Sequence, residues 1–213
     1  MAETYPVLGE GWEKNERTTG QQRWYTGGKR MFDVVCAGLL LLLSAPLFGV
    51  LALLIKWDTA GPVLFRQRRV GQDGRLFWIY KFRTMYSHTP SYARKPDDAD
   101  ASKITPLGAY LRVTALDELP QLFNVFKGEM SLVGPRPEMP FIVRTYTPYQ
   151  RQRLAVKPGI TGLWQLSQVR HAPIHENLHY DLDYIKQQSL LLDLKILLRT
   201  LVFCARTLKI MCC

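Results

Sequence analysis

The chain has 213 residues, 47% hydrophobic side chains and a formal net charge of +10. This length suffices for one sizeable core plus a membrane segment and excludes two full-sized domains. The excess of 28 Lys and Arg over 18 Asp and Glu predicts an anionic partner, whether nucleic acid, a lipid surface or a phosphorylated substrate. The four cysteines show no CxxC spacing, which argues against a zinc site or a disulfide framework.

Residues 1–28 are polar and lack periodicity, so we interpret them as a flexible tail without an export signal. An uncharged run follows from Val34 to Ile55, and as a helix it would reach about 30 Å, enough to cross a hydrocarbon core. Lys and Arg flank it on both sides, which is typical of a segment that enters and leaves the membrane on one face. Pro46 breaks the helical hydrogen-bond ladder, and Ser44 is placed to satisfy part of it. We therefore predict a re-entrant helical hairpin over residues 29–57, the alternative being a kinked spanning helix.

Two strand-like runs around the turn sequence GQDG predict a β-hairpin within residues 62–85. Alternation would place Lys81 and Arg83 on one of its faces. Residues 86–103 are rich in Pro, Ser and Asp and predict a loop with a solvated acidic cluster.

The segment LDELPQLFNVFKG, residues 116–128, predicts a short helix that has Pro120 in its first turn and ends at Gly128. Its apolar residues follow helical spacing: Leu119, Leu122, Phe123 and Phe126. The segments SLVGPRPEMP and KPGITG are predicted to be rigid turns, the first of which presents Arg136.

Two more helices are predicted, one from about Ile174 to Gln187 and one over residues 189–211. In the last helix four basic residues fall within one narrow sector: Lys195, Arg199, Arg206 and Lys209. This pattern fits a helix lying in a membrane interface, or equally a core helix with one solvated stripe.

Asp117 and Glu118 are adjacent acids in a basic chain, and two interpretations are open. As structural residues, they would cap a helix start and complement its dipole. As chemical groups, they could hold Mg²⁺ against substrate phosphates or attack phosphorus. Phosphoryl transfer also requires cations around the acid, and four candidates are available: Lys81, Arg83, Arg112 and Arg136. Each of these could instead be a solvated charge.

The sequence HENLH fits the H-E-x-x-H pattern, in which His175 and His179 would bind zinc and Glu176 would act as the base. This alternative would make the chain a membrane-bound zinc metalloprotease, but no third ligand follows in a recognised pattern. Surface histidines on an amphipathic helix are the simpler interpretation. A non-catalytic basic membrane scaffold or nucleic-acid binder is a further alternative.

Six ordered blocks resemble the bacterial sugar transferases, the small monotopic polyprenol-phosphate phosphoglycosyltransferases: KRMFDVV, GPVLFRQRRVG, YKFRTM, LDELPQLFNVFKGEMSLVGPRP, KPGITG and LLDLKILLRT. The resemblance runs from about Lys29 to Thr207. It implies transfer of a sugar phosphate from a nucleotide diphosphate sugar, a UDP-sugar, to undecaprenyl phosphate, with release of UMP and with Mg²⁺ as cofactor. It also implies the bacterial inner membrane and its lipids, the first membrane step of exopolysaccharide, O-antigen or other glycan biosynthesis, and no nucleic acid. Homo-oligomerisation stays open.

By the same resemblance, Asp117 would be the nucleophile of an aspartyl-phosphosugar intermediate and a metal ligand, with Glu118 as its partner. The substrate phosphates would be bound by four basic residues: Lys81, Arg83, Arg112 and Arg136. The chain departs from the family pattern at Ala115, where Ser or Thr is usual, and at residues 168–170, where Gln-Val-Arg replaces Gly-Arg-Asn.

The expected fold is α+β and membrane-associated, with a small β-hairpin and several helices, some of them amphipathic and interfacial. Its expected parts are the tail of residues 1–28, the re-entrant helix of residues 29–57, and a catalytic domain of residues 58–213 on the cytoplasmic face with an interfacial C-terminal helix.

Overall fold

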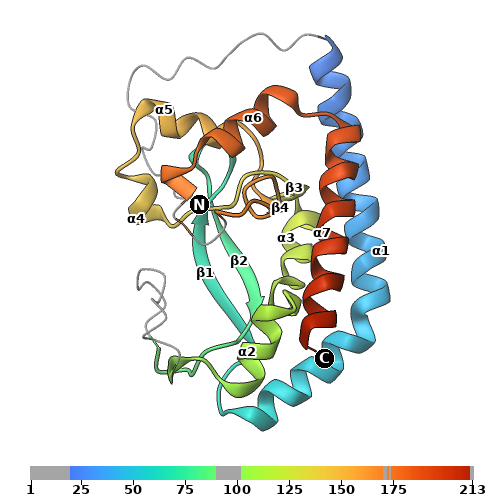
Figure 1. Ribbon diagram of the computed structural model, residues 1–213, viewed down its shortest axis with the longest axis vertical. Helices are drawn as coiled ribbons and strands as arrows, with labels where there is room; N and C mark the ends of the chain where they lie inside the picture. The colour runs from blue at the N-terminus through green and yellow to red at the C-terminus, as the bar shows by residue number, and fades with distance from the viewer. Residues whose placement is uncertain (1–19, 90–101, 170–171, 173, 212–213) are drawn as a thin grey trace.

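The computed structural model describes residues 20–89, 102–169, 172 and 174–211 (Figure 1). The predicted acidic cluster of the loop, Arg170 and most of the predicted tail lie outside the described residues. The helices are α1 (Gly20–Asp58), α2 (Pro106–Val113), α3 (Gln121–Lys127), α4 (Pro140–Val143), α5 (Pro148–Arg151), α6 (His179–Gln187) and α7 (Leu190–Met211). Short 3-10 turns are η1 (Gln72–Gly74), η3 (Leu116–Glu118), η4 (Gln152–Ala155) and η5 (Ile174–Glu176), and the strands are β1 (Leu64–Val70), β2 (Leu76–Phe82), β3 (Ser131–Val133) and β4 (Gly159–Thr161).

Helix α1 is continuous through Pro46 and bends in its second half (Figure 1). Ser44, two residues before the proline, donates a hydrogen bond to the carbonyl of Leu40, one turn earlier in the helix, at 2.5 Å. A proline inside a helix removes one backbone donor and produces a kink. The predicted break therefore takes the form of a bend within one helix, and not of a loop between two helices.

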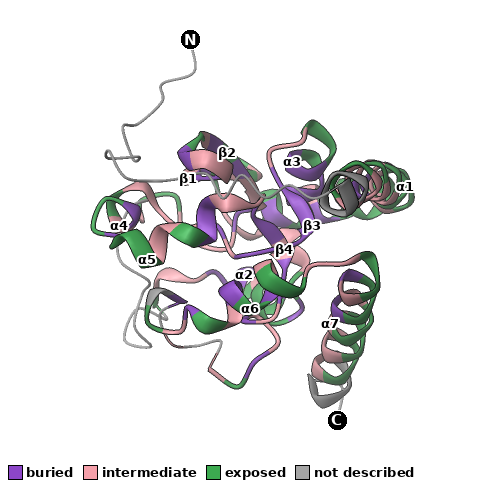
Figure 2. Cartoon of the chain, turned by 90° about the horizontal axis from the view of Figure 1, so that it is seen from above, coloured by how far each residue is buried: buried purple, intermediate pink, exposed green. Residues whose placement is uncertain are grey.

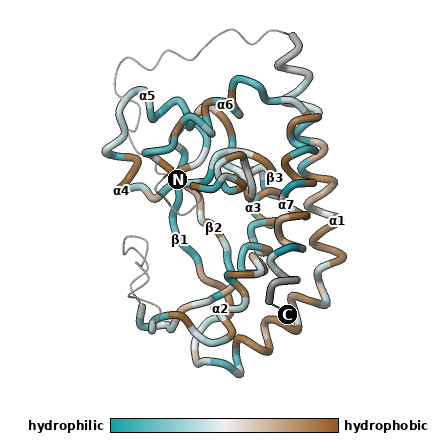
Figure 3. The backbone as a smooth tube through the Cα atoms, viewed as in Figure 1, coloured by the Kyte–Doolittle hydropathy of each residue, from teal (hydrophilic) through white to brown (hydrophobic). Residues whose placement is uncertain are grey.

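The apolar part of α1 has little cover from the rest of the chain. Residues Tyr25–Asp58 are long and apolar enough to cross a membrane, and only 11% of their most apolar window is buried. Leu43 is 76% exposed and Trp57 is 85% exposed. In Figure 3 the hydrophobic residues of α1 appear as a brown stretch of the backbone tube. An apolar surface of this extent on one helix is compatible with membrane association.

The predicted β-hairpin is confirmed. Strands β1 and β2 pair in antiparallel register from Leu64 opposite Phe82 to Val70 opposite Leu76. The turn between them contains Asp73 at φ 54°, a left-handed conformation that Asp tolerates better than most residues. Phe77 and Ile79 lie on one face of the hairpin and enter the main core, whereas Val70 lies on the other face and packs in a second cluster with Val143 and Leu154.

A second, parallel pair of strands occupies part of the two segments predicted as rigid turns, and this pairing was not predicted, whereas residues 134–139 with Arg136 lie in no helix or named strand. Ser131 of β3 pairs with Gly159 of β4, and Val133 pairs with Thr161. A Cβ on Gly159 would lie 2.0 Å from the backbone nitrogen of Gly134, so only glycine permits this approach. Figure 2 shows both strands in the buried centre of the chain. Three-residue strands are too short to show an alternating pattern in the sequence.

The remaining helices follow the predictions in part. Gly128 ends α3 at φ 91° as predicted, whereas the two acids before α3 form the separate turn η3. The helix predicted from Ile174 starts only at His179, after η5. Helix α7 agrees with its predicted bounds and buries Ile196 against the core that β2, α3 and β3 also form.

One face of α7 is apolar and uncovered. Leu191, Leu198 and Leu201 are exposed, next to the basic sector that contains Lys195 and Arg199. A core helix with one solvated stripe would bury these leucines. The exposure therefore favours the predicted interfacial helix.

Candidate active site

The acid pair follows an unusual backbone turn. Helix α2 ends at Thr114, whose hydroxyl donates to the carbonyl of Tyr110 at 2.9 Å. Ala115 then takes a left-handed conformation, φ 56° and ψ 14°, and the chain enters η3 with Asp117 and Glu118. Such a conformation costs a residue with a Cβ about 1–2 kcal/mol. Strained residues of this kind concentrate at functional sites.

Glu118 lies between two cations. Its Oε1 accepts from Lys81 Nζ at 2.5 Å and from Arg136 Nη2 at 3.2 Å. Burial by itself would raise the pKa of Glu118, but the charges and hydrogen bonds of Lys81 and Arg136 hold it at about 2. Glu118 is therefore ionised at any physiological pH, and it fixes both cations beside Asp117.

Asp117 has a different environment. It is 8% exposed, and no group within the described residues donates a hydrogen bond to its carboxylate. Burial raises the pKa of Asp117, and the charge of Glu118 adds to this, whereas Lys81, Arg136 and Arg112 lower it. The result is a carboxylate with unused lone pairs inside a cationic site.

The capping interpretation of the acid pair is wrong. The residue before η3 is Ala115 and the residue before α3 is Pro120, and neither turn has a side-chain cap. Asp117 and Glu118 lie within η3 and do not satisfy a helix N-terminus. Their burial needs another explanation, and the surrounding cations supply it.

Three of the four predicted cations lie around the acid pair. Lys81 and Arg136 contact Glu118, and the exposed Arg112 on α2 is close enough to lower the pKa of Asp117. Arg112 has no hydrogen-bond or ion-pair partner within the described residues, so its donors remain available to a ligand. The fourth cation, Arg83, points elsewhere: it donates to the carbonyls of Ile55, Thr59 and Ala60 at the end of α1. Its substrate role stays a prediction.

Asn124 was missed in the sequence and is fully buried. Its Nδ2 donates to the carbonyl of Trp78 at 2.6 Å and to Glu129 at 2.7 Å, while its Oδ1 accepts from the amide of Tyr80 at 3.2 Å. These hydrogen bonds connect α3 to β2, the strand that carries Lys81. A single polar residue on the apolar side of LFNVF was the only signal available.

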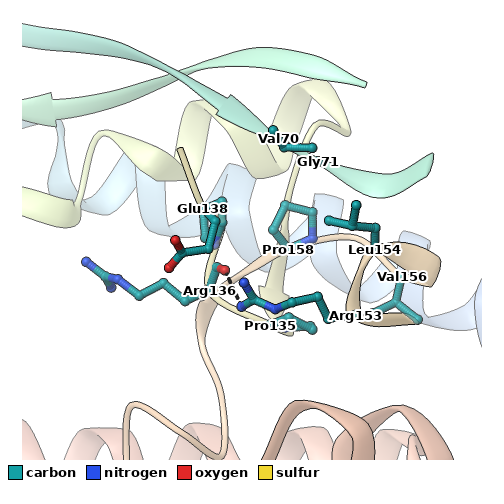
Figure 4. A pocket seen from close by; sticks show the side chains of 10 residues that line it. Val70, Gly71, Pro135, Arg136, Glu138, Arg153, Leu154, Val156 and Pro158 are labelled. Atoms are coloured by element: carbon teal, nitrogen blue, oxygen red, sulfur yellow. Dashed lines mark hydrogen bonds between the residues drawn. The ribbon is translucent and has the colours of Figure 1, made fainter. Parts of the chain in front are cut away.

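Arg153 was also missed, and it supports the segment that carries Arg136. Its guanidinium donates to Asp181 at 2.8 Å, to the Tyr146 hydroxyl at 2.6 Å and to the carbonyl of Arg136 at 2.7 Å. Figure 4 shows Arg153 and Arg136 lining one small pocket, with the Arg136 side chain extending away from Arg153. Nothing in the sequence around Arg153 indicates this role.

The zinc-protease alternative does not fit the structure. Glu176 ends the turn η5 and His179 begins α6, so the motif HENLH does not lie on one helix as zinc binding requires. In the described part of the chain, no three His, Cys, Asp or Glu side chains gather to hold a metal.

Comparison with known proteins identifies the family of the chain. The family model for bacterial sugar transferases matches residues 24–207. The chain belongs to the bacterial sugar transferase family. It is similar to the UDP-glucose:undecaprenyl-phosphate glucose-1-phosphate transferase of Caulobacter vibrioides, at 43% identity over 81% of this chain and 67% of that protein.

Two further relatives illustrate the range of the bacterial sugar transferase family. The undecaprenyl-phosphate galactose phosphotransferase of Salmonella typhimurium is 38% identical over 81% of this chain but only 39% of its own length. The exopolysaccharide production protein ExoY of Rhizobium meliloti is 37% identical over 81% of this chain and 83% of its own length. The chain thus spans well under half of some of the relatives that it matches.

The residues of this family member fit a magnesium ion in one respect. The Asp117 carboxylate accepts no hydrogen bond within the described residues, so its oxygens are available to a metal. Mg²⁺ in phosphate-transfer sites is typically bound by one or two carboxylates together with substrate phosphates and water. Glu118, by contrast, is already occupied by Lys81 and Arg136.

Replacing Ala115 by Gly should raise the free energy of unfolding by up to about 1 kcal/mol. Gly accepts the left-handed conformation without the Cβ clash, and this gain exceeds the added entropy of the unfolded chain. Thermal or denaturant unfolding in detergent measures it.

The matched control is Ala109→Gly, at an exposed position inside α2. There the same exchange should destabilise the protein by about 0.5–1 kcal/mol. Equal destabilisation at both positions would contradict the strained backbone at Ala115.

Proposed function

We propose that this protein transfers a sugar phosphate from a UDP-sugar to undecaprenyl phosphate, with release of UMP and through an aspartyl-phosphosugar intermediate. The observation that carries this proposal is the difference between the two acids: Glu118 forms ion pairs with Lys81 and Arg136, while the Asp117 carboxylate accepts no hydrogen bond within the described residues. An unpaired carboxylate surrounded by cations is suited to attack an anionic phosphate.

In the first step, the donor diphosphate lies against Lys81, Arg112 and Arg136, which offset its negative charge. A carboxylate oxygen of Asp117 attacks the phosphorus that bears the sugar. The bond from that phosphorus to the bridging oxygen breaks, and UMP leaves with that oxygen. The cations stabilise the charge that spreads over the equatorial oxygens.

In the second step, a phosphate oxygen of undecaprenyl phosphate attacks the same phosphorus. The bond from phosphorus to Asp117 breaks, which restores the carboxylate and yields the polyprenyl diphosphate sugar. When bound, Mg²⁺ would supply further neutralisation of the phosphate charge, held by Asp117. Lys81 and Arg136 keep their positions throughout because Glu118 binds both.

We propose that α1 is re-entrant and that the catalytic part, residues 58–213, lies on the cytoplasmic face of the inner membrane. Support comes from the exposed apolar surface of α1, the bend in its second half and the Lys and Arg on both flanks. The exposed leucines of α7 would meet the same membrane surface. This arrangement brings a lipid acceptor and a soluble donor to one interface.

A donor panel tests the proposed function. Purified full-length protein is incubated with undecaprenyl phosphate, Mg²⁺ and UDP-glucose, UDP-galactose or UDP-N-acetylgalactosamine, and released UMP is measured together with the lipid product. At least one UDP-sugar should give both. Absence of UMP release with every nucleotide sugar, from protein that is folded and lipid-embedded, would overturn the proposal.

The pH dependence of kcat/KM should report Asp117 and not Glu118. Burial raises the pKa of Asp117, and attack requires the ionised form, so activity should fall with decreasing pH at values above the ordinary aspartate pKa. Glu118, with a pKa of about 2, stays ionised over that range. Because Arg112 lowers the pKa of Asp117, the normalised acid limb of Arg112→Gln should shift to higher pH. An unshifted or lowered limb would contradict this placement of Arg112.

A further inference from the structure

A second group of cations lies at the opposite end of α3 from the acid pair. Lys29 and Arg30 stand just before the apolar run of α1, and Lys157 precedes β4. These three side chains act on one another electrostatically, together with the buried Asp33. None of them takes part in the proposed transfer.

Two of these cations have acceptors within the protein. Arg30 donates to the carbonyls of Val125 at 2.7 Å and Phe126 at 3.0 Å, at the C-terminal end of α3. Lys29 forms an ion pair with Asp193 of α7 at 2.8 Å. These bonds connect the part of α1 just before its apolar run to α3 and α7 and hold the two cations in place.

Lys157 differs, because its three N–H donors find no acceptor among the described residues. Lys157 and Arg30 lie against the same side of Gly128. A Cβ built on Gly128 would lie 3.6 Å from Lys157 Nζ and 3.0 Å from Arg30 Nη2. Burial lowers the pKa of Lys157, and Arg30 lowers it further, against the opposing effect of Asp33. The Asp33 carboxylate is itself directed to the backbone amide of Leu132. Two cations thus crowd one side of Gly128 without an anion bonded to Lys157.

Exposed apolar side chains adjoin this cationic group. Met31 and Val35 follow Arg30 on α1 and are 69% and 53% exposed, and Phe126 at the end of α3 is half exposed. Cations that directly precede an exposed apolar helix lie where headgroups meet acyl chains. A free phosphate would use only the cations, whereas a phospholipid would use both surfaces.

We propose that Arg30 and Lys157 bind the phosphate of an anionic phospholipid headgroup, whose acyl chains lie against the exposed apolar face of α1 at Met31 and Val35. The headgroup would supply the acceptor that Lys157 lacks and relieve its repulsion with Arg30. This site is separate from the acid pair, so the lipid-binding proposal does not depend on the proposed transfer reaction.

The test uses the detergent-solubilised full chain titrated with a short-chain phosphatidylglycerol, a short-chain phosphatidylcholine or inorganic phosphate, with saturable change in Tm as the readout. Phosphatidylglycerol should bind, and Lys157→Gln should weaken its apparent Kd about fivefold, since one basic residue near a lipid surface contributes about that factor. UMP release in detergent should be unchanged in this variant. Lys157→Arg should retain binding, which separates charge from packing.

Lys186→Gln is the matched control, because Lys186 is exposed on α6 and lies in none of these contacts. It should bind phosphatidylglycerol like the unmodified protein. The proposal is overturned if Lys157→Gln binds phosphatidylglycerol as tightly as the unmodified protein does. It is also overturned if phosphatidylcholine binds equally well, because the site would then have no preference for anionic lipid. Equal binding of inorganic phosphate would overturn it too, because the site would then be one for a free anion.

Discussion

An Asp117→Asn enzyme should release no UMP from its UDP-sugar, with or without undecaprenyl phosphate. The amide oxygen is a poor nucleophile, and loss of a nucleophile costs at least about a thousandfold in rate. The unmodified protein, given donor and Mg²⁺ but no acceptor, should release UMP up to about one equivalent, because the phosphosugar stays on Asp117. Rapid quench with UMP detection measures both, and mass spectrometry of the intact protein should find the adduct only when Asp117 is present.

The Asp117→Asn exchange should also raise the free energy of unfolding. Burial raises the pKa of Asp117, so the fold favours its neutral form and works against the charge at neutral pH. A neutral isostere removes that cost, and we expect an increase in unfolding free energy of about 0.5–2 kcal/mol. Asp183 is an exposed acid on α6, so Asp183→Asn is the control. It should change neither UMP release nor the free energy of unfolding. An Asp117→Asn enzyme that turns over normally would refute the nucleophile assignment.

Asp181→Asn should destabilise the protein by about 3–5 kcal/mol. Asp181 and Arg153 form a buried ion pair at 2.7 Å, and both side chains are almost fully removed from solvent. Removing one partner leaves an unpaired buried charge, which is the costly case. Denaturant unfolding in detergent should show the loss.

The double variant Arg153→Met with Asp181→Leu tests the reason. Removing both charges eliminates the unpaired group, so the double variant should be more stable than Asp181→Asn. It also loses the hydrogen bonds from Arg153 to the Tyr146 hydroxyl and the Arg136 carbonyl, so we expect a raised KM for the donor. A double variant as unstable as the single one would show that the pair contributes through packing and not through charge.

Several elements could be predicted from the sequence because their signals are local. The hairpin β1–β2 follows from alternation around GQDG, and the end of α3 follows from a glycine that accepts φ 91°. The apolar run predicted a long membrane-associated helical segment with a break at Pro46, and the structure has one continuous apolar helix α1 there. The acid pair stood out because two adjacent carboxylates are unusual in a basic chain.

The convergence of charges was decided by tertiary structure. Lys81 and Arg136 lie 37 and 18 residues away from Glu118 in sequence, yet both contact the same oxygen. Arg83, two residues beyond Lys81, bonds instead to the end of α1, and no periodicity distinguishes the two. The position of Lys81 on β2 depends on how α3 packs on that strand, and the buried Asn124 contributes to this packing through hydrogen bonds with Trp78 and Tyr80.

The sequence by itself therefore determined the long apolar helix and the hairpin, and it supplied the candidate residues of the site, since each of these signals lies within one continuous segment of the chain. Only the tertiary structure decided the parallel strands β3 and β4, the pair of Arg153 and Asp181, and the unequal environments of Asp117 and Glu118. These depend on contacts between distant segments, where the energy of a group is set by its burial and by the charges beside it, and neither quantity is a property of local sequence.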